Sequence, residues 1–92
     1  MDQATYEGAI NRLIAAAELV ASGASQEQRL NALQMVAFFR LRQASFGTQG
    51  VPRISNEELF NETATAALTM AGRKEFLAAA ALLDQARTLV GG

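Results

Sequence analysis

The stretch from Leu30 to Phe46, LNALQMVAFFRLRQASF, decides the fold class of this chain. Read as an α-helix at about 100° per residue, it has two apolar stripes on nearly opposite sides. The first stripe consists of Leu30, Leu33, Ala37, Leu41 and Ala44. The second consists of Met35, Phe39 and Phe46, with Val36 and Phe38 between the two stripes. A surface helix needs only one apolar stripe. We therefore expect this helix either to be the centre of a bundle or to be divided between a core and an interface.

Length and composition favour a single all-α domain over residues 1–92. Half of the 92 residues are apolar and the net charge is only −1, which is unlike a disordered polar chain. The sequence contains nineteen alanines, eleven leucines and one proline. Alanine and leucine are strong helix formers, and proline is the strongest helix breaker. The composition therefore predicts helices with few interruptions.

Periodicity, caps and breakers predict four helices. Their expected bounds are about 3–22, 26–46, 56–71 and 73–90. The linker 47–55, GTQGVPRIS, contains two glycines and Pro52, which end helices. Ser25 with Gln28, and Ser55 with Glu58, have the spacing of capping boxes. We predict two antiparallel helical hairpins, 1–46 and 55–90, folded into a small four-helix bundle.

The same pattern predicts which side chains face the core. Leu13, Leu33, Leu41 and Leu83 each lie in the stripe of their helix that is expected to point inward. The second stripe of the second helix then remains as a candidate interface, and a symmetric homodimer is a common way to cover such a face.

Several classes of chemistry lack their usual residues. The chain has no cysteine and no histidine, so it lacks thiol chemistry and the commonest general base and metal ligand. Glu57, Glu58 and Glu62 lie at an expected helix start, where carboxylates stabilise the helix dipole. Di-metal sites in bundles use Glu-x-x-His motifs, which this chain cannot form. We expect no enzyme activity, no cofactor and no metal site.

A protein–protein interaction module is the function that these features favour. The expected partner-binding residues are Met35, Phe39 and Phe46 with Arg40 and Arg42, together with Val51, Pro52 and Arg53 of the linker. The partner is another protein or a second copy of the chain. The alternative is a nucleic-acid-associated regulator that uses Arg40, Arg42 and Arg53 as a phosphate-binding patch.

The sequence also bears on location. The N-terminus, MDQATYEG, lacks the basic start and apolar run of a signal peptide. No uninterrupted apolar stretch approaches the roughly 18 residues that a membrane span needs. We expect a cytoplasmic protein without a membrane partner.

Overall fold

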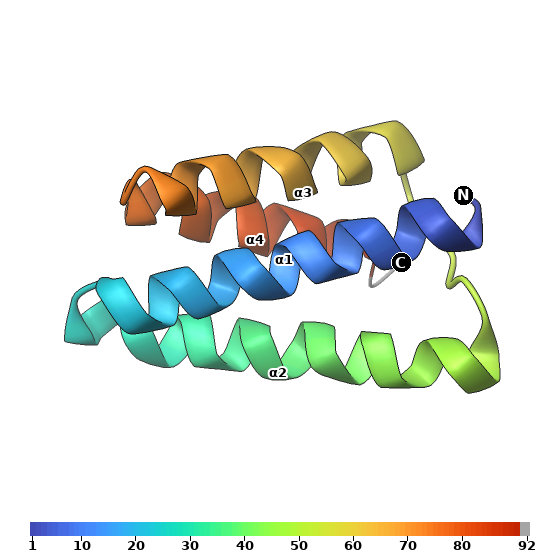
Figure 1. The fold of residues 1–92 in the computed structure, drawn as a ribbon, viewed down its shortest axis with the longest axis horizontal. Coiled ribbons are helices and arrows are strands. Elements are labelled where there is room, and N and C mark those ends of the chain that lie inside the picture. Colours follow the sequence, from blue (N-terminus) through green and yellow to red (C-terminus); the bar gives the residue numbers. More distant parts are fainter. Residues whose placement is uncertain (91–92) are drawn as a thin grey trace.

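The computed structural model describes residues 1–90, which form four α-helices (Figure 1). Their bounds are α1 Gln3–Gly23, α2 Gln26–Gln49, α3 Glu57–Gly72 and α4 Phe76–Val90. The described residues contain no strand. The predicted all-α four-helix bundle is therefore confirmed.

Helix α1 is the centre of the bundle. It packs against α2 on one side and α3 on the other, while α4 packs against α3 and also touches α1 and α2 (Figure 1). Eight residues of α1 are buried, whereas α2 contributes only Ala32, Met35 and Phe39. Of the two alternatives for the second helix, the structure excludes the central one. Helix α2 has one face in the core and the other on the surface.

The two apolar stripes of α2 are exchanged relative to the prediction. Met35 and Phe39 are buried, with 4% and 0% of their surface exposed. Leu33 and Leu41 are 51% and 68% exposed, so the prediction that they face inward is wrong. Both stripes have helical periodicity, and periodicity alone cannot select between them. Leu13 of α1 is fully buried, as predicted.

The aromatic side chains explain the choice of stripe. The ring of Tyr6 on α1 lies 5.6 Å from that of Phe46 on α2 and 6.4 Å from that of Phe60 on α3. Phe39, which lies seven residues before Phe46 and so on the same side of α2, belongs to the buried core. Leu83 of α4 belongs to the same buried cluster, as predicted. Large flat side chains bury more apolar area than leucines and alanines, which favours this orientation of α2.

Two side chains cap helix starts, and neither belongs to the two serines for which capping boxes are predicted. The Asp2 carboxylate accepts the Thr5 backbone N–H at 2.7 Å, and the Asn56 side chain accepts the Leu59 N–H at 3.1 Å. Ser25 precedes α2 but its side chain makes no capping bond. Ser55, the expected cap of α3, instead donates its backbone N–H to the Leu89 carbonyl at 3.1 Å. Ser55 therefore ties the linker to the end of α4.

The linker between α2 and α3 is shorter than predicted, whereas the turn between α3 and α4 is longer. Helix α2 runs beyond Phe46 to Gln49 and ends at Gly50, whose φ is 71°. The linker thus begins at Gly50, and Ile54 within it is buried in the core. Helix α4 begins at Phe76, after a turn in which Lys74 has a φ of 64°.

Candidate functional site

An exposed row of apolar side chains runs along the outer face of α2. Leu30, Leu33 and Leu41 are 66%, 51% and 68% exposed, and Ala37 and Ala44 between and beyond them are also exposed. We call these five residues the α2 leucine stripe. They share one side of the helix because they follow each other at three- and four-residue intervals.

The stripe faces away from the bundle because the opposite side of α2 is in the core. Phe39 is fully buried and lies about half a turn from Ala37 around the helix axis.

Elsewhere the chain exposes single leucines on separate helices: Leu19 on α1, Leu59 on α3 and Leu77 on α4. Single exposed leucines are ordinary on protein surfaces, whereas an aligned apolar row is typical of interaction sites.

Two polar contacts lie along the seam between α1 and α2, beside the stripe. A guanidinium nitrogen of Arg40 lies 2.6 Å from a carboxylate oxygen of Glu18. The Gln43 side-chain amide donates to the Asn11 side-chain oxygen, also at 2.6 Å. Both contacts are exposed, so the ion pair contributes little to stability by itself. Their effect is to occupy the polar groups beside the stripe.

The structure does not place the predicted apolar site residues on the surface. Met35 and Phe39 belong to the core, and Phe46 is half-buried against Tyr6. Val51 and Pro52 in the linker are half-buried, and Val51 packs against the core. These side chains are needed within the bundle, so the exposed apolar surface of α2 consists of the other stripe.

The three arginines of the predicted patch have different surroundings. Arg40 pairs with Glu18, while the Arg42 guanidinium carbon lies 5.1 Å from the centre of the Phe38 ring in a cation–π contact. Residues two apart are about 200° apart around a helix, so Arg40 and Arg42 leave α2 on different sides. Arg53 is exposed in the linker.

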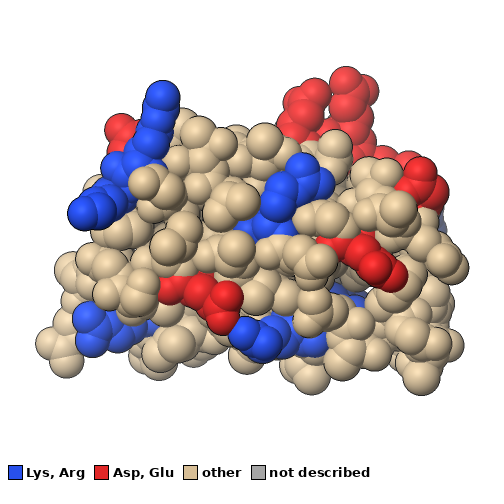
Figure 2. All heavy atoms as spheres, in the orientation of Figure 1, with Lys and Arg blue, Asp and Glu red and all other residues tan. Residues whose placement is uncertain are grey.

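Figure 2 shows how charge is distributed over one face of the molecule. Much of this face is uncharged, and the blue and red side chains are scattered over it. Acidic side chains gather at the upper right, where α3 begins with the exposed Glu57 and Glu58. Glu57 lies 2.6 Å from the amino group of Met1. These carboxylates stabilise the start of a helix, as expected.

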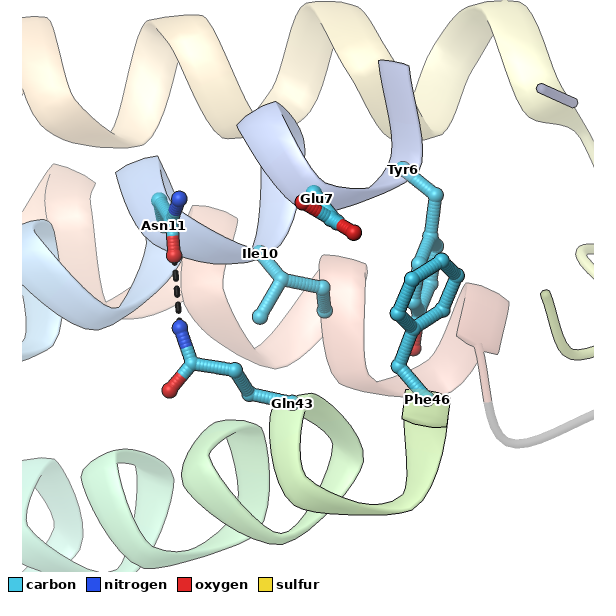
Figure 3. A pocket seen from close by; sticks show the side chains of 6 residues that line it. All are labelled: Tyr6, Glu7, Ile10, Asn11, Gln43 and Phe46. Carbon is cyan, nitrogen blue, oxygen red and sulfur yellow. Dashed lines mark hydrogen bonds between the residues drawn. The ribbon is translucent and has the colours of Figure 1, made fainter. Parts of the chain in front are cut away.

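A small pocket lies between the first turns of α1 and the end of α2 (Figure 3). Its volume is about 230 Å³. Its lining is Tyr6, Glu7, Ile10 and Asn11 from α1 with Gln43 and Phe46 from α2. The hydrogen bond between Gln43 and Asn11 spans one side of it, and the Phe46 ring lies over Tyr6 on the other (Figure 3). The pocket is smaller than the roughly 300–1,000 Å³ of most ligand sites. The sequence analysis did not predict it.

The residues that line this pocket do not form a reactive site. Burial raises the pKa of the Tyr6 hydroxyl, and the positive charge of Arg42 acts in the opposite direction. Tyr6 therefore stays protonated at neutral pH and is not an activated nucleophile. Glu7 is the one carboxylate in the lining, so the pocket lacks the acid–base pair that hydrolysis commonly uses.

Residues 1–90 offer neither a metal-binding cluster nor a helix that could span a membrane. No three His, Cys, Asp or Glu side chains in this part of the chain are close enough together to hold a metal ion. None of its helices has both the length and the hydropathy needed to cross a bilayer.

Comparisons with protein-family models, curated proteins and solved structures give no match to this chain. The site must therefore be interpreted from its own geometry.

Proposed function

We propose that this chain is a non-enzymatic helical interaction module that binds a protein partner through the α2 leucine stripe. The observation that carries the proposal is the alignment of three largely exposed leucines on a helix whose opposite face is in the core. The function class is the one that the sequence favours, and the binding face is moved to the other side of α2.

The three leucines supply part of the free energy that binding requires. Full burial of a leucine side chain stabilises by about 1.5–3 kcal/mol, so covering three leucines that are half to two-thirds exposed contributes about 3–6 kcal/mol in total. Association itself costs an estimated 4–15 kcal/mol. The leucines alone do not offset this cost, so a partner must also contact Ala37, Ala44 and the polar edges of the stripe.

The remaining features of the chain are consistent with a role without catalysis. It contains no histidine or cysteine, and its one tyrosine is held protonated in the core. The nucleic-acid alternative requires Arg40, Arg42 and Arg53 to act together, whereas Arg40 is already paired with Glu18. We therefore do not advance it as a second proposal.

Substitution of the stripe tests the proposal. Leu33→Gln/Leu41→Gln removes its exposed apolar surface, and Leu59→Gln/Leu77→Gln is a matched control on α3 and α4. Both variants should keep the helical circular-dichroism spectrum and the melting temperature, because all four leucines are exposed. Proteins captured by the tagged wild-type chain, identified by quantitative mass spectrometry, should be retained by the control and lost by the stripe variant. Equal capture by all three chains would place the binding surface elsewhere.

A further inference from the structure

Helix α2 is the element that the rest of the bundle holds least firmly. Only Ala32, Met35 and Phe39 are buried among its 24 residues, whereas α1 buries eight of 21, α3 five of 16 and α4 four of 15. It packs closely on α1, touches α4 lightly and makes no close contact with α3, which lies on the far side of α1 (Figure 1). Because buried apolar contacts determine how firmly an element is held, α2 has the weakest hold for its length.

The two side-chain polar contacts between α1 and α2 are exposed. Arg40 pairs with Glu18, and the Gln43 amide donates to the Asn11 side-chain oxygen. Exposed ion pairs contribute little to stability, because water screens the charges and solvates them equally well when they separate. Separation of α2 from α1 therefore costs little in polar contacts.

The start of α2 also lacks the support that the starts of α1 and α3 receive. The Ser25 side chain makes no capping hydrogen bond, whereas Asp2 caps α1 and Asn56 caps α3. Without a cap, the first backbone N–H groups of a helix have no protein partner, and the helix is weaker. Helix α2 therefore has less local support as well as fewer buried side chains.

The chain is held at fixed points on both sides of α2. Before the helix, Ala24 is 7% exposed and donates its backbone N–H to the Val20 carbonyl of α1. After the helix, Ile54 is 9% exposed, and Ser55 donates both its backbone N–H and its hydroxyl to the Leu89 carbonyl of α4. Helix α2 can thus lose its structure between two points that stay attached to α1 and α4.

The other three helices are joined by contacts that do not involve α2. Helix α3 packs closely on both α1 and α4. Phe60 of α3 and Leu83 of α4 are fully buried. The Arg12 guanidinium of α1 donates to the Thr65 hydroxyl and to the Asn61 side-chain oxygen of α3, both at 2.8 Å. These contacts remain when α2 leaves its place.

We propose that α2 is a separate cooperative unit, which unfolds and refolds between Ala24 and Ile54 while α1, α3 and α4 stay folded. Opening removes Met35 and Phe39 from the core and exposes the side of α1 on which α2 packs. The open state is a minor one, because closing buries these side chains again.

This opening is a means of regulating the α2 leucine stripe. The stripe is a single apolar row only while α2 is helical, since its residues lie three and four positions apart in the sequence. A partner bound to the stripe therefore stabilises the closed state, and conditions that open α2 weaken binding. This consequence rests on the proposed function, whereas the opening itself does not.

Native-state hydrogen exchange tests the opening in the chain alone, followed amide by amide by NMR at low urea concentrations. Amides in the middle of α2, residues 30–46, should exchange at least about 10-fold faster than the most protected amides of α1 and α3. Their exchange rates should also rise less steeply with urea, because opening of α2 exposes less surface than global unfolding. Equal rates with equal urea dependence in all four helices would overturn the proposal.

Two alanine-to-glycine variants separate this local opening from global unfolding. Ala37 and Ala81 are both exposed and lie inside α2 and α4. Glycine weakens a helix interior, so each change should accelerate exchange about fivefold in every opening that unfolds its helix. Ala81→Gly should therefore accelerate the slowest amides of α1, α3 and α4 and leave those of α2 unchanged. Ala37→Gly should accelerate the amides of α2 and the slowest amides alike. Acceleration of α2 by Ala81→Gly would show one cooperative unit and contradict the proposal.

The two proposals can fail separately. If α2 exchanges as its own unit but the Leu33→Gln/Leu41→Gln variant still captures the proteins that the wild-type chain captures, the proposed function is wrong and the opening stands. If that variant loses these proteins but α2 exchanges together with the other helices, the opening is wrong and the proposed function stands.

Discussion

Gly23 lies directly against the ring of Phe76. A Cβ atom at Gly23 would come within 2.5 Å of Cζ of Phe76, closer than any ordinary contact. Gly23 is the last residue of α1, and Phe76 is the first residue of α4. The missing side chain thus allows the start of α4 to approach the end of α1. A glycine at a helix end usually serves a left-handed turn, but here the cap position is Ala24, which has extended backbone.

Replacement of Gly23 by alanine should therefore destabilise the bundle. The Phe76 ring must move to admit the new methyl group, and overpacking of this kind typically costs about 1–3 kcal/mol. Gly47→Ala is the matched control, because nothing lies within 4 Å of its added Cβ and it lies inside α2. That change should stabilise by up to about 1 kcal/mol through helix propensity. Urea unfolding of both variants measures the two effects, and a neutral Gly23→Ala would show that Phe76 yields freely.

Phe39→Ala and Leu41→Ala should differ sharply in their effect on unfolding. Phe39 is fully buried, so its truncation leaves a cavity and should lower the free energy of unfolding by about 3–5 kcal/mol. Leu41 is exposed, and its truncation should change this free energy by no more than about 0.5 kcal/mol in dilute, monomeric protein. Chemical denaturation at low micromolar concentration provides the comparison. Equal losses would mean that the leucine side of α2 is also buried in the folded chain.

Lys74→Gly should stabilise the turn between α3 and α4. Lys74 has a φ of 64°, a left-handed conformation that costs a residue with a Cβ about 1–2 kcal/mol. Glycine relieves this strain but loses more chain entropy on folding, so a net gain of about 0.5–1 kcal/mol is expected. Lys74→Ala removes the same charge but keeps the Cβ, and it should bring no gain. Thermal unfolding distinguishes the two, and equal melting temperatures would assign any effect to the lost charge.

The Asp2 cap should make stability depend on acid pH. Acceptance of the Thr5 backbone N–H lowers the pKa of Asp2 below its ordinary value of 3.8. Since the folded state holds the ionised form, this contribution is complete well above pH 3.8 and is lost as the pH falls through the lower, folded-state pKa. Asp2→Asn keeps a capping side chain without the charge. The stability difference between wild type and Asp2→Asn should shrink between about pH 5 and pH 2 in urea titrations, and a constant difference would contradict the assignment.

Much of the fold could be predicted from local patterns. The number and type of helices follow from alanine and leucine propensity, the break at Pro52 and the polar residues before each helix, all of which act within a few residues. Helix ends could not be predicted as closely, because a residue next to a helix end can bond to a group far away in sequence. Ser55 could have capped α3, but it bonds to Leu89 of α4 and leaves the cap to Asn56. Similarly, α2 continues through Gly47 to Gln49, and its last turns pack on α1 through Phe46.

The sequence analysis recognised the two apolar stripes of α2 but predicted the wrong one to be buried. By itself, the sequence determined that α2 has two apolar stripes and that only one of them is needed for the core. Only the tertiary structure decided which one is buried, because helical periodicity is the same for both. The choice depends on how α2 fits the rest of the bundle, where the Phe46 ring lies 5.6 Å from that of Tyr6 and Phe39 belongs to the buried core. The packing of α2 against helices distant in the sequence is decided only in the folded bundle. This packing leaves Leu30, Leu33 and Leu41 on the outside.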